Sequence, residues 1–170
     1  AIKRGTPVAG DVELFAQFIV HHSSLSTAKV LAITGTNGKS TVTRMAGDIC
    51  AAAGFDTVVA GNIGTPVLDA LTAIENGRAA PGAFVLELSS FQLESTASLN
   101  ADAAAMLNLS ADHLDRHHDI DAYAAAKARV FNGSGAQVLN RDARHSSAMA
   151  LPRRTVCRFG LDAPRGERQW

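Results

Sequence analysis

The sequence has few cysteines, few aromatic residues and no net charge, and each shortage excludes a class of protein. Its two cysteines, Cys50 and Cys157, lie far apart in apolar segments, so we expect buried free thiols and no disulfide framework. The 16 basic and 16 acidic side chains cancel, so the charge gives no indication of nucleic acid or an anionic membrane as a partner. Aromatic residues make up only 5% of an alanine-rich chain, a composition typical of α/β proteins.

Long apolar runs are also missing. No run approaches the length of a membrane span, and residues 1–5 are not followed by the apolar segment of a secretory signal. We therefore expect a cytoplasmic protein. The 170 residues are enough for one domain with a substantial core.

Short apolar runs alternate with helix-like segments along the chain. The runs typical of strands cover residues 30–33, 57–60, 83–86, 103–107, 137–139 and 155–159. Helices are expected after a cap at Asp11, from residue 39 to about 53, after Pro66, and from a cap at Asp121 to Phe131. One face of the second helix should carry Val42, Met45, Ala46, Ile49, Cys50 and Ala53. This alternation predicts an α/β fold with a mostly parallel sheet flanked by helices, and residues 160–170 read as a polar tail.

The glycine-rich segment after the first predicted strand carries the strongest functional indication. It reads Gly35-Thr36-Asn37-Gly38-Lys39-Ser40-Thr41 and leads into a predicted helix. Such a turn points backbone N–H groups and a helix N-terminus at phosphate, while the lysine reaches the terminal phosphates and the serine can ligate Mg²⁺. The strict P-loop pattern requires a glycine where Ile33 stands, so a purely structural turn remains the alternative.

Further polar residues follow the other predicted strands. Glu87 ends the strand at 83–86, where it is a candidate Mg²⁺ ligand or simply a surface acid. Asn62, in the turn 61–64, suits either ligand contact or a structural turn. Residues 108–119 are rich in His and Asp; they form either a metal site or a solvated loop, and the absence of nearby cysteines excludes structural zinc. Within them we expect His117, His118 and Asp119 at the surface. Composition alone also places Lys127 at the surface.

Several of these stretches together resemble the central domain of the Mur ligases, most of all the branch that adds D-glutamate. The resemblance covers roughly residues 11–159. It is carried by the glycine-rich turn and by four further runs: Gly61-Asn62-Ile63-Gly64, Glu87-Leu88-Ser89-Ser90-Phe91-Gln92-Leu93-Glu94, Asp112-His113-Leu114-Asp115-Arg116 and Ala126-Lys127-Ala128-Arg129. The turn is shared with folylpolyglutamate synthases, whereas the run from Glu87 to Glu94 favours the D-glutamate branch.

The resemblance implies a cytoplasmic, ATP-dependent amide ligase of peptidoglycan precursor synthesis. UDP-N-acetylmuramoyl-L-alanine and D-glutamate would be its substrates, joined through an acyl phosphate, with two Mg²⁺ ions. Lys39 would bind the β- and γ-phosphates, Ser40 and Glu87 the first Mg²⁺, and His113 and a carbamylated Lys127 the second. Asn62, Ser89 and Gln92 would face the nucleotide-sugar substrate or the metals. Neither nucleic acid nor membrane is implied, and a monomer is favoured.

The resemblance also implies a domain division. Residues 1–10 would be the remnant of a preceding N-terminal domain, and residues 11–170 part of the central ATP-binding domain. Such a piece is expected to have little or no activity alone. The alternatives are a folylpolyglutamate-type or other Mur-type ligase, and a nucleotide-binding fragment without catalysis. A GTPase is disfavoured, because the guanine-reading Asn-Lys-x-Asp motif is missing and only Asn140-Arg141-Asp142 comes near it.

Overall fold

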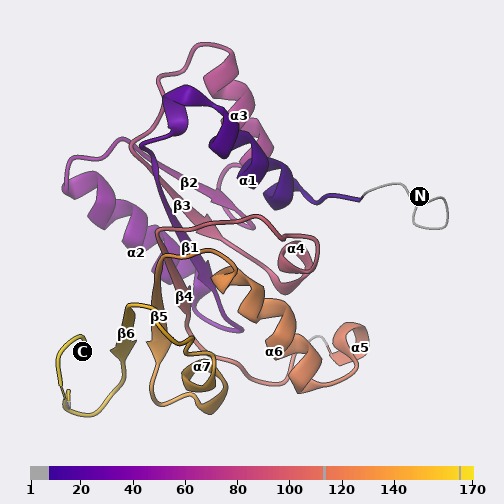
Figure 1. The fold of residues 1–170 in the computed structure, drawn as a ribbon, viewed down its shortest axis with the longest axis vertical. Helices are drawn as coiled ribbons and strands as arrows, with labels where there is room; N and C mark the ends of the chain where they lie inside the picture. Colours follow the sequence, from indigo (N-terminus) through magenta and orange to yellow (C-terminus); the bar gives the residue numbers. More distant parts are fainter. Residues whose placement is uncertain (1–7, 113, 165) are drawn as a thin grey trace.

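The computed structural model describes residues 8–112, 114–164 and 166–170 of the chain. These residues form a six-stranded sheet in the order β2-β3-β1-β4-β5-β6 (Figure 1), and every neighbouring pair of strands is parallel. The strands are β1 (Lys29–Thr34), β2 (Thr57–Gly61), β3 (Ala83–Glu87), β4 (Ala103–Met106), β5 (Ala136–Asn140) and β6 (Val156–Phe159). The predicted α/β fold with a mostly parallel sheet is therefore confirmed.

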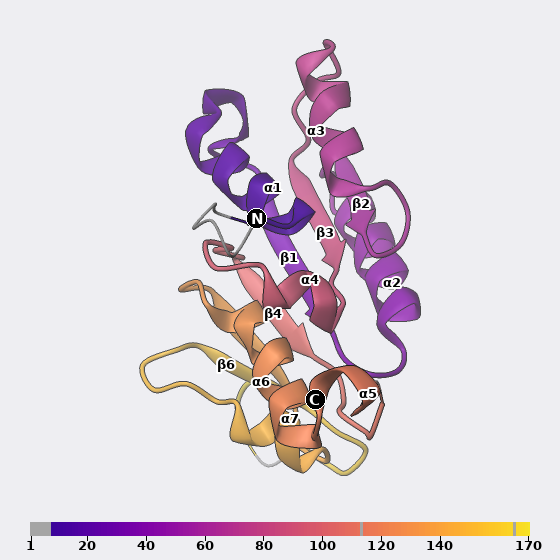
Figure 2. The same cartoon turned by 90° about the vertical axis from the view of Figure 1, so that its right-hand side faces the viewer.

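Helices lie on both sides of this sheet. One helix, α2, covers one side, whereas α1, α3, α4 and α6 lie on the other (Figures 1 and 2). The helices are α1 (Asp11–His21), α2 (Lys39–Ala52), α3 (Val67–Glu75), α4 (Ser90–Glu94), α5 (Leu114–His117), α6 (Ile120–Ala128) and α7 (Arg144–Ala148), with the short 3-10 turns η2 (Ser23–Leu25) and η3 (Arg129–Phe131). No helix among the described residues is both long and apolar enough to cross a membrane.

Two hydrophobic clusters, one on each side of the sheet, explain why the strands read as unbroken apolar runs. In β3, Phe84 and Leu86 belong to the larger cluster with α1 and α3, whereas Val85 belongs to the smaller cluster beneath α2. All three side chains have no exposed surface. Successive strand residues point to opposite faces, so a strand covered on both faces needs apolar side chains at every position.

The starts of two helices differ from their prediction. Gly10, not Asp11, is the N-cap of α1, and the carboxylate of Asp11 instead accepts a hydrogen bond from Nε2 of Gln92 at 3.0 Å. Asp119, not Asp121, caps α6: its Oδ1 accepts a hydrogen bond from the backbone N–H of Ala122 at 2.7 Å. Asp119 and Asp121 have the same capping chemistry, so the sequence does not choose between them. The backbone conformation at the start of α6 does.

The buried face of α2 also differs from its prediction. Met45 and Ile49 are 56% and 66% exposed, whereas Thr43 and Gly47 are buried. The reason is a close approach at Gly47, where an added Cβ would lie 2.5 Å from Cγ2 of Val59 on β2. The helix therefore turns its smallest residue to the sheet. Val42, Ala46 and Cys50 of the predicted face do pack against the smaller cluster, whereas Met45 and Ile49 turn outward.

The C-terminal residues pair with the sheet, although the sequence reads as a polar tail. The backbone N–H of Trp170 donates to the carbonyl oxygen of Arg158 on β6 at 2.9 Å, and the N–H of Arg158 donates to the carbonyl of Arg168 at 2.8 Å. The guanidinium of Arg141 also bonds Asp162. Backbone pairing needs no apolar pattern, so the sequence held no indication of it. Both cysteines are free, as expected, and both are half-buried.

Candidate functional site

The carboxyl ends of β1, β3 and β4 meet at one edge of the sheet. The chain leaves β1 for α2 on one side of the sheet, while the chain beyond β3 leads to α4 on the other side (Figure 2). Ligands of open parallel sheets bind in the crevice that such a divergence creates. The glycine-rich turn and Glu87 both lie at this edge.

The turn from Gly35 to Gly38 has the conformation expected of a phosphate-binding loop. Gly38 is the N-cap of α2 with φ +79°, a left-handed conformation that favours glycine. The first turn of α2 directs N–H groups without helical partners into the crevice. Asn108, in the loop after β4, holds the turn in place: its Oδ1 accepts a hydrogen bond from the N–H of Asn37 at 2.8 Å, and its Nδ2 donates to the carbonyl oxygen of Asn37 at 2.9 Å.

Two predicted phosphate and metal ligands lie at the start of α2. The Nζ of Lys39 donates to the carbonyl oxygen of Thr36 at 2.8 Å, so the side chain folds back over the turn. Ser40 follows on the exposed first turn of the helix. A lysine held by one carbonyl can exchange that contact for a phosphate oxygen, which makes a charge-assisted bond.

Glu87 is buried, which excludes the alternative of a surface acid. It is 1% exposed, and its Oε1 accepts a hydrogen bond from Nδ2 of Asn62 at 2.8 Å. Its Oε2 is buried without a hydrogen-bond partner among the described residues. A buried carboxylate oxygen without a partner is costly, and a cation removes that cost. The backbone of Gly61 (φ +108°), just before Asn62, packs closely against Glu87. Only glycine fits there, because an added Cβ would lie 2.3 Å from the carbonyl oxygen of Glu87.

Lys127 is buried at the same edge, so the surface position that composition favours is wrong. It is 1% exposed, and its Nζ donates to the carbonyl oxygen of Gly35 at 2.9 Å. The Nζ also lies 4.7 Å from the centroid of the Tyr123 ring. Burial, together with the nearby positive charge of Lys39, lowers the pKa of Lys127 to about 8.

These side chains surround a cavity of about 260 Å³, which we call the reaction cavity. Its lining residues are Lys39, Asn62, Ser89, Ser90, Phe91, Tyr123 and Lys127. It combines the two cationic amines beside the glycine-rich turn of residues 35–38, which we call the phosphate turn, with a hydroxyl and an aromatic ring on α4, the amide of Asn62 after β2 and the phenol of Tyr123 on α6. Such a cavity can hold a phosphoryl group between lysines next to a polar acceptor.

Gln92, the third predicted substrate contact, does not line the reaction cavity. Its side chain closes a capping box on α4: Oε1 accepts from the N–H of Ser89 at 3.1 Å, and the Ser89 hydroxyl accepts from the N–H of Gln92 at 3.2 Å. Its Nε2 is bonded to Asp11. In this arrangement Gln92 positions Ser89 and the start of α4.

The residues present fit Mg²⁺ better than a transition metal. No group of three or more His, Cys, Asp or Glu side chains suited to a metal occurs within residues 8–112, 114–164 and 166–170. Mg²⁺ keeps several waters and needs only one or two carboxylates plus substrate phosphates. The free oxygen of Glu87 and the hydroxyl of Ser40 suit that role. His113, predicted as a ligand of a second Mg²⁺, lies outside the described residues.

His117 is buried, so its predicted place at the surface is wrong. It is 4% exposed and lies between α4 and α6. His118 and Asp119, the other two residues of that prediction, are exposed as expected. Sequence reasoning missed Tyr123 as part of the site, and it gave Asn108 no role of its own within the segment 108–119. Their positions depend on the tertiary packing of α6 and of the loop after β4 against the phosphate turn, and no local sequence pattern predicts that packing.

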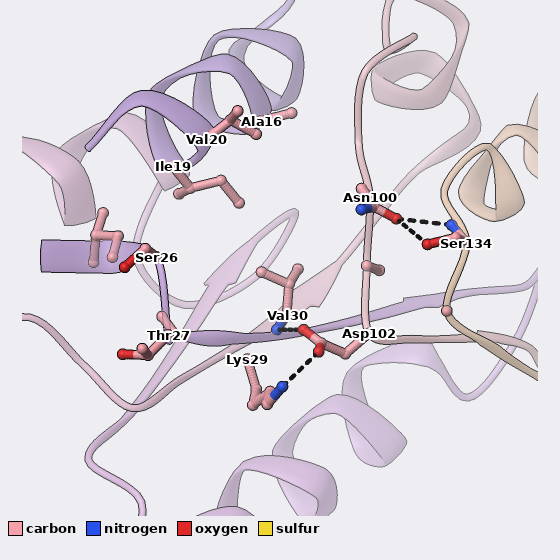
Figure 3. Close-up of a pocket in the computed structure, with 14 residues that line it drawn as sticks. Ala16, Ile19, Val20, Ser26, Thr27, Lys29, Val30, Asn100, Asp102 and Ser134 are labelled. Carbon is pink, nitrogen blue, oxygen red and sulfur yellow. Dashed lines mark hydrogen bonds and ion pairs between the residues drawn. The ribbon is translucent and has the colours of Figure 1, made fainter. Parts of the chain in front are cut away.

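A larger cavity, of about 400 Å³, lies at the opposite edge of the sheet, where β1 and β4 begin (Figure 3). Its charged groups are already paired: Lys29 Nζ lies 2.9 Å from Asp102 Oδ1, and Asp102 Oδ2 accepts from the N–H of Val30 at 2.9 Å. Asn100 Oδ1 likewise accepts from the N–H of Ser134. No predicted site residue lies there, so the functional assignment follows the smaller reaction cavity.

Comparison with known proteins identifies the family and the relatives of this chain. The Mur ligase middle domain matches residues 33–168. A "UDP-N-acetylmuramoylalanine--D-glutamate ligase" of Thiobacillus denitrificans is 57% identical over 171 residues, covering 95% of this chain and 36% of the relative. One of the same name from Methylobacillus flagellatus is 60% identical over 165 residues, covering 97% and 34%. The chain thus spans about a third of the length of these curated relatives.

Solved structures agree on the fold. MurF from Acinetobacter baumannii superposes with a TM-score of 0.65 at 20% identity, over 86% of this chain and 34% of that protein. FolC from E. coli gives 0.64 at 17% identity, over 94% and 50%. At such low identity these two structures bear on the fold alone. The match over residues 33–168 decides the family, and the chain belongs to the Mur ligases as a middle domain.

Proposed function

We propose that the protein that carries this chain is an ATP-dependent ligase that joins D-glutamate to UDP-N-acetylmuramoyl-L-alanine. The observation that carries the proposal is the 57–60% identity to curated relatives of that one name over at least 95% of the chain. The folylpolyglutamate-type alternative has only a likeness of fold, at 17% identity to FolC. The reaction cavity is lined by Lys39 and Lys127, and Glu87 lies next to it through its hydrogen bond with Asn62, so the site has the chemistry that the proposal needs.

The nucleotide would lie on the phosphate turn. The N–H groups of residues 35–41 and the ammonium of Lys39 would hold the β- and γ-phosphates. Ser40 and Glu87 would hold one Mg²⁺, whose role when bound is to neutralise charge on the phosphates and polarise the transferred group. Glu87 is suited to this role by its buried oxygen without a partner. His113 and Lys127 would serve the second ion.

The chemistry would proceed in two steps within the reaction cavity. A carboxylate oxygen of the alanyl substrate attacks the γ-phosphorus of ATP. The bond between that phosphorus and the bridging β-phosphate oxygen breaks, so ADP departs and an acyl phosphate is formed. The neutral amine of D-glutamate then attacks the acyl carbon to form a tetrahedral intermediate. The nitrogen loses one proton, the carbon–oxygen bond to the phosphoryl group breaks, and an amide and inorganic phosphate result. Lys39 would stay in contact with the phosphoryl group during its transfer and neutralise its charge, and the N–H groups of the turn would hold the departing ADP. Asn62 and Ser89 would face the acceptor.

Lys127 is suited to carbamylation, which would turn a cation into an oxygen ligand. The neutral amine attacks CO₂, a nitrogen–carbon bond forms, and one proton is lost to give a carbamate anion. Only the neutral amine is nucleophilic, and the buried Lys127 has a pKa lowered to about 8. As an ammonium, Lys127 would repel a divalent cation at this place.

The remaining predictions concern the whole protein. By the resemblance, residues 1–10 would continue from an N-terminal domain and residues 11–170 would be part of the central domain. We propose a monomer in the cytoplasm, without nucleic acid or membrane partners. Because ligation needs all reactants enclosed together, we expect this chain alone to be inactive or nearly so.

Phosphate release by the full-length protein tests the proposal. Release should require ATP, Mg²⁺, UDP-N-acetylmuramoyl-L-alanine and D-glutamate together. A parallel assay offers a folate acceptor with L-glutamate, the substrates expected of the folylpolyglutamate-type alternative. Turnover only with the folate pair would overturn the proposed substrates, and ATP binding without turnover of either pair would indicate a nucleotide-binding protein. Robust D-glutamate-dependent release by this chain alone would contradict its expected inactivity.

A further inference from the structure

His117 stands behind the wall of the reaction cavity without lining it. Its Nε2 lies 3.0 Å from Oγ of Ser90. Its ring stacks on Phe91 with centroids 5.6 Å apart and planes at 12°, and its centroid lies 5.0 Å from that of Tyr123. Ser90, Phe91 and Tyr123 all line the cavity. One buried imidazole therefore contacts three of the seven lining residues, on α4 and on α6.

A carboxylate orients this imidazole from the other side. The Nδ1 of His117 lies 3.3 Å from Oε1 of Glu94, and Oε2 of Glu94 pairs with Arg116 at 2.9 Å. A carboxylate only accepts hydrogen bonds, so it favours a proton on Nδ1. In the neutral ring, Nε2 is then left as the acceptor for the Ser90 hydroxyl. The Ser90 oxygen keeps its lone pairs for a donor in the cavity.

The wall that His117 supports carries no charge. Ser90 contributes a hydroxyl and Phe91, which is 43% exposed, an aromatic ring. Lys39 and Lys127 lie on the side of the phosphate turn. Phosphate groups are therefore drawn to the lysines. The neutral wall is left for the polar acceptor, which must present its carboxylate to the phosphoryl group.

We propose that His117 is a positioning residue for the acceptor substrate, held by Glu94 and acting through Ser90, Phe91 and Tyr123. The identity of the acceptor rests on the proposed function. The arrangement of His117 does not rest on the proposed function, because it follows from contacts within the chain. The two parts are therefore tested separately.

The first test measures the ring of His117 in this chain by long-range ¹H–¹⁵N NMR. We expect a single tautomer with a proton on Nδ1 and a bare Nε2 that accepts a hydrogen bond. Ser90→Ala should shift the Nε2 resonance, and Glu94→Gln should disturb the tautomer. The exposed His118 serves as the internal reference. A mixture of tautomers at His117, unmoved by either substitution, would overturn the arrangement whatever the protein's activity.

The second test separates the acceptor from the nucleotide in the full-length protein. His117→Phe keeps an aromatic ring between Phe91 and Tyr123 but removes both polar contacts. We expect the KM for UDP-N-acetylmuramoyl-L-alanine to rise roughly tenfold, as for the loss of one well-placed hydrogen bond, with the KM for ATP nearly unchanged. His117→Gln, which can still bond Ser90, should recover part of the loss, and the exposed-site control His118→Asn should show no change.

Other outcomes contradict the proposal. Equal rises in both KM values, or a fall in thermal stability with unchanged KM values, would reduce His117 to a structural residue. If His117→Phe does not fold, His117→Gln and Ser90→Ala decide the question by the same split between acceptor and nucleotide. A wild-type protein without activity on this acceptor refutes the proposed function, while the NMR result still decides the positioning by Glu94 and Ser90.

Discussion

The Nζ of Lys127 lies 2.9 Å from the carbonyl oxygen of Gly35, so a lysine near the end of α6 reaches the first residue of the phosphate turn. The two residues are 92 positions apart in the sequence. Their contact brings the amine next to Lys39, whose charge opposes a second ammonium at this place. The protonation of a lysine on α6 therefore depends on its place beside the turn, and the first prediction concerns that protonation.

Lys127 should take up CO₂ as the pH rises. With a pKa of about 8, about half of its amines are neutral at pH 8, where an ordinary lysine is almost fully protonated. Incubation of this chain with ¹³C-bicarbonate should therefore give a carbamate signal in ¹³C NMR that grows from about pH 7 to 9. Lys127→Met should lose the signal, and Lys29→Met, which removes an exposed lysine, should keep it. A signal that persists in Lys127→Met would place the carbamate elsewhere.

The same lysine makes the stability of the fold depend on pH. Its pKa in the folded state is about 8 and its ordinary value 10.5, so between these values the unfolded chain binds more protons. The free energy of unfolding should then rise with pH across this window. Urea titrations of wild type at pH 8 and pH 10 should show the rise, and Lys127→Met should show less of it. An equal rise in both proteins would assign the effect to other groups.

Lys39→Ala should weaken nucleotide binding. Loss of a charge-assisted contact to phosphate costs roughly 1.5–3 kcal/mol, which is a 10- to 150-fold change in affinity. Calorimetry with Mg²⁺ and ATP on this chain measures it. Lys29→Ala, at the opposite edge of the sheet, is the matched control and should bind like wild type. Equal affinity of Lys39→Ala and wild type would remove Lys39 from the phosphate site.

Glu87→Gln should separate metal binding from folding. The substitution removes a buried negative charge whose second oxygen has no hydrogen-bond partner among the described residues, so without Mg²⁺ the thermal midpoint should stay equal or rise. The dependence of ATP affinity on Mg²⁺ should largely disappear. Asn62→Ala tests the neighbouring contact and should weaken this dependence less. Undiminished Mg²⁺ dependence in Glu87→Gln would refute the proposed ligand.

Glu13 should stabilise the fold at neutral pH and lose this effect in acid. Its carboxylate accepts hydrogen bonds from the backbone N–H groups of Ala97 and Ser98, which lower its pKa from 4.5 to about 2. The stabilisation is complete above the unfolded value and is lost as the pH falls from about 4.5 towards 2. Glu13→Gln should cost about 1–3 kcal/mol at pH 7 and little at pH 2.

Urea titrations of wild type and Glu13→Gln at the two pH values give the comparison. Glu75→Gln, on the exposed end of α3, is the control for a loss of charge without these contacts. A difference that stays constant between pH 7 and pH 2 would show that the contribution of Glu13 does not come from its charge.

How far the sequence could predict the site differs from residue to residue. Gly38, Lys39 and Ser40 were predictable because their roles depend on a local unit, a strand, a turn and a helix start, that a few adjacent residues specify. Glu87 was predictable as a candidate because it ends an apolar strand, but its burial was not. Gln92 was matched by resemblance as a substrate contact, and the structure shows it bonded within the capping box and to Asp11.

The sequence by itself determined the parallel α/β order, since apolar runs and helical periods record local geometry. It also determined the glycine-rich turn before α2, which is the candidate phosphate site. Only the tertiary structure decided the burial of Lys127 and His117 and the free oxygen of Glu87. A charged or polar side chain can lie at the surface, or it can lie in the interior if its polar atoms have hydrogen-bond or ionic partners there. The difference lies in partners that are 25 to 93 residues away, namely Asn62 for Glu87, Ser90 for His117, and Thr34 and Gly35 for Lys127. Such partners meet only after the chain has folded, because no local pattern encodes their distance.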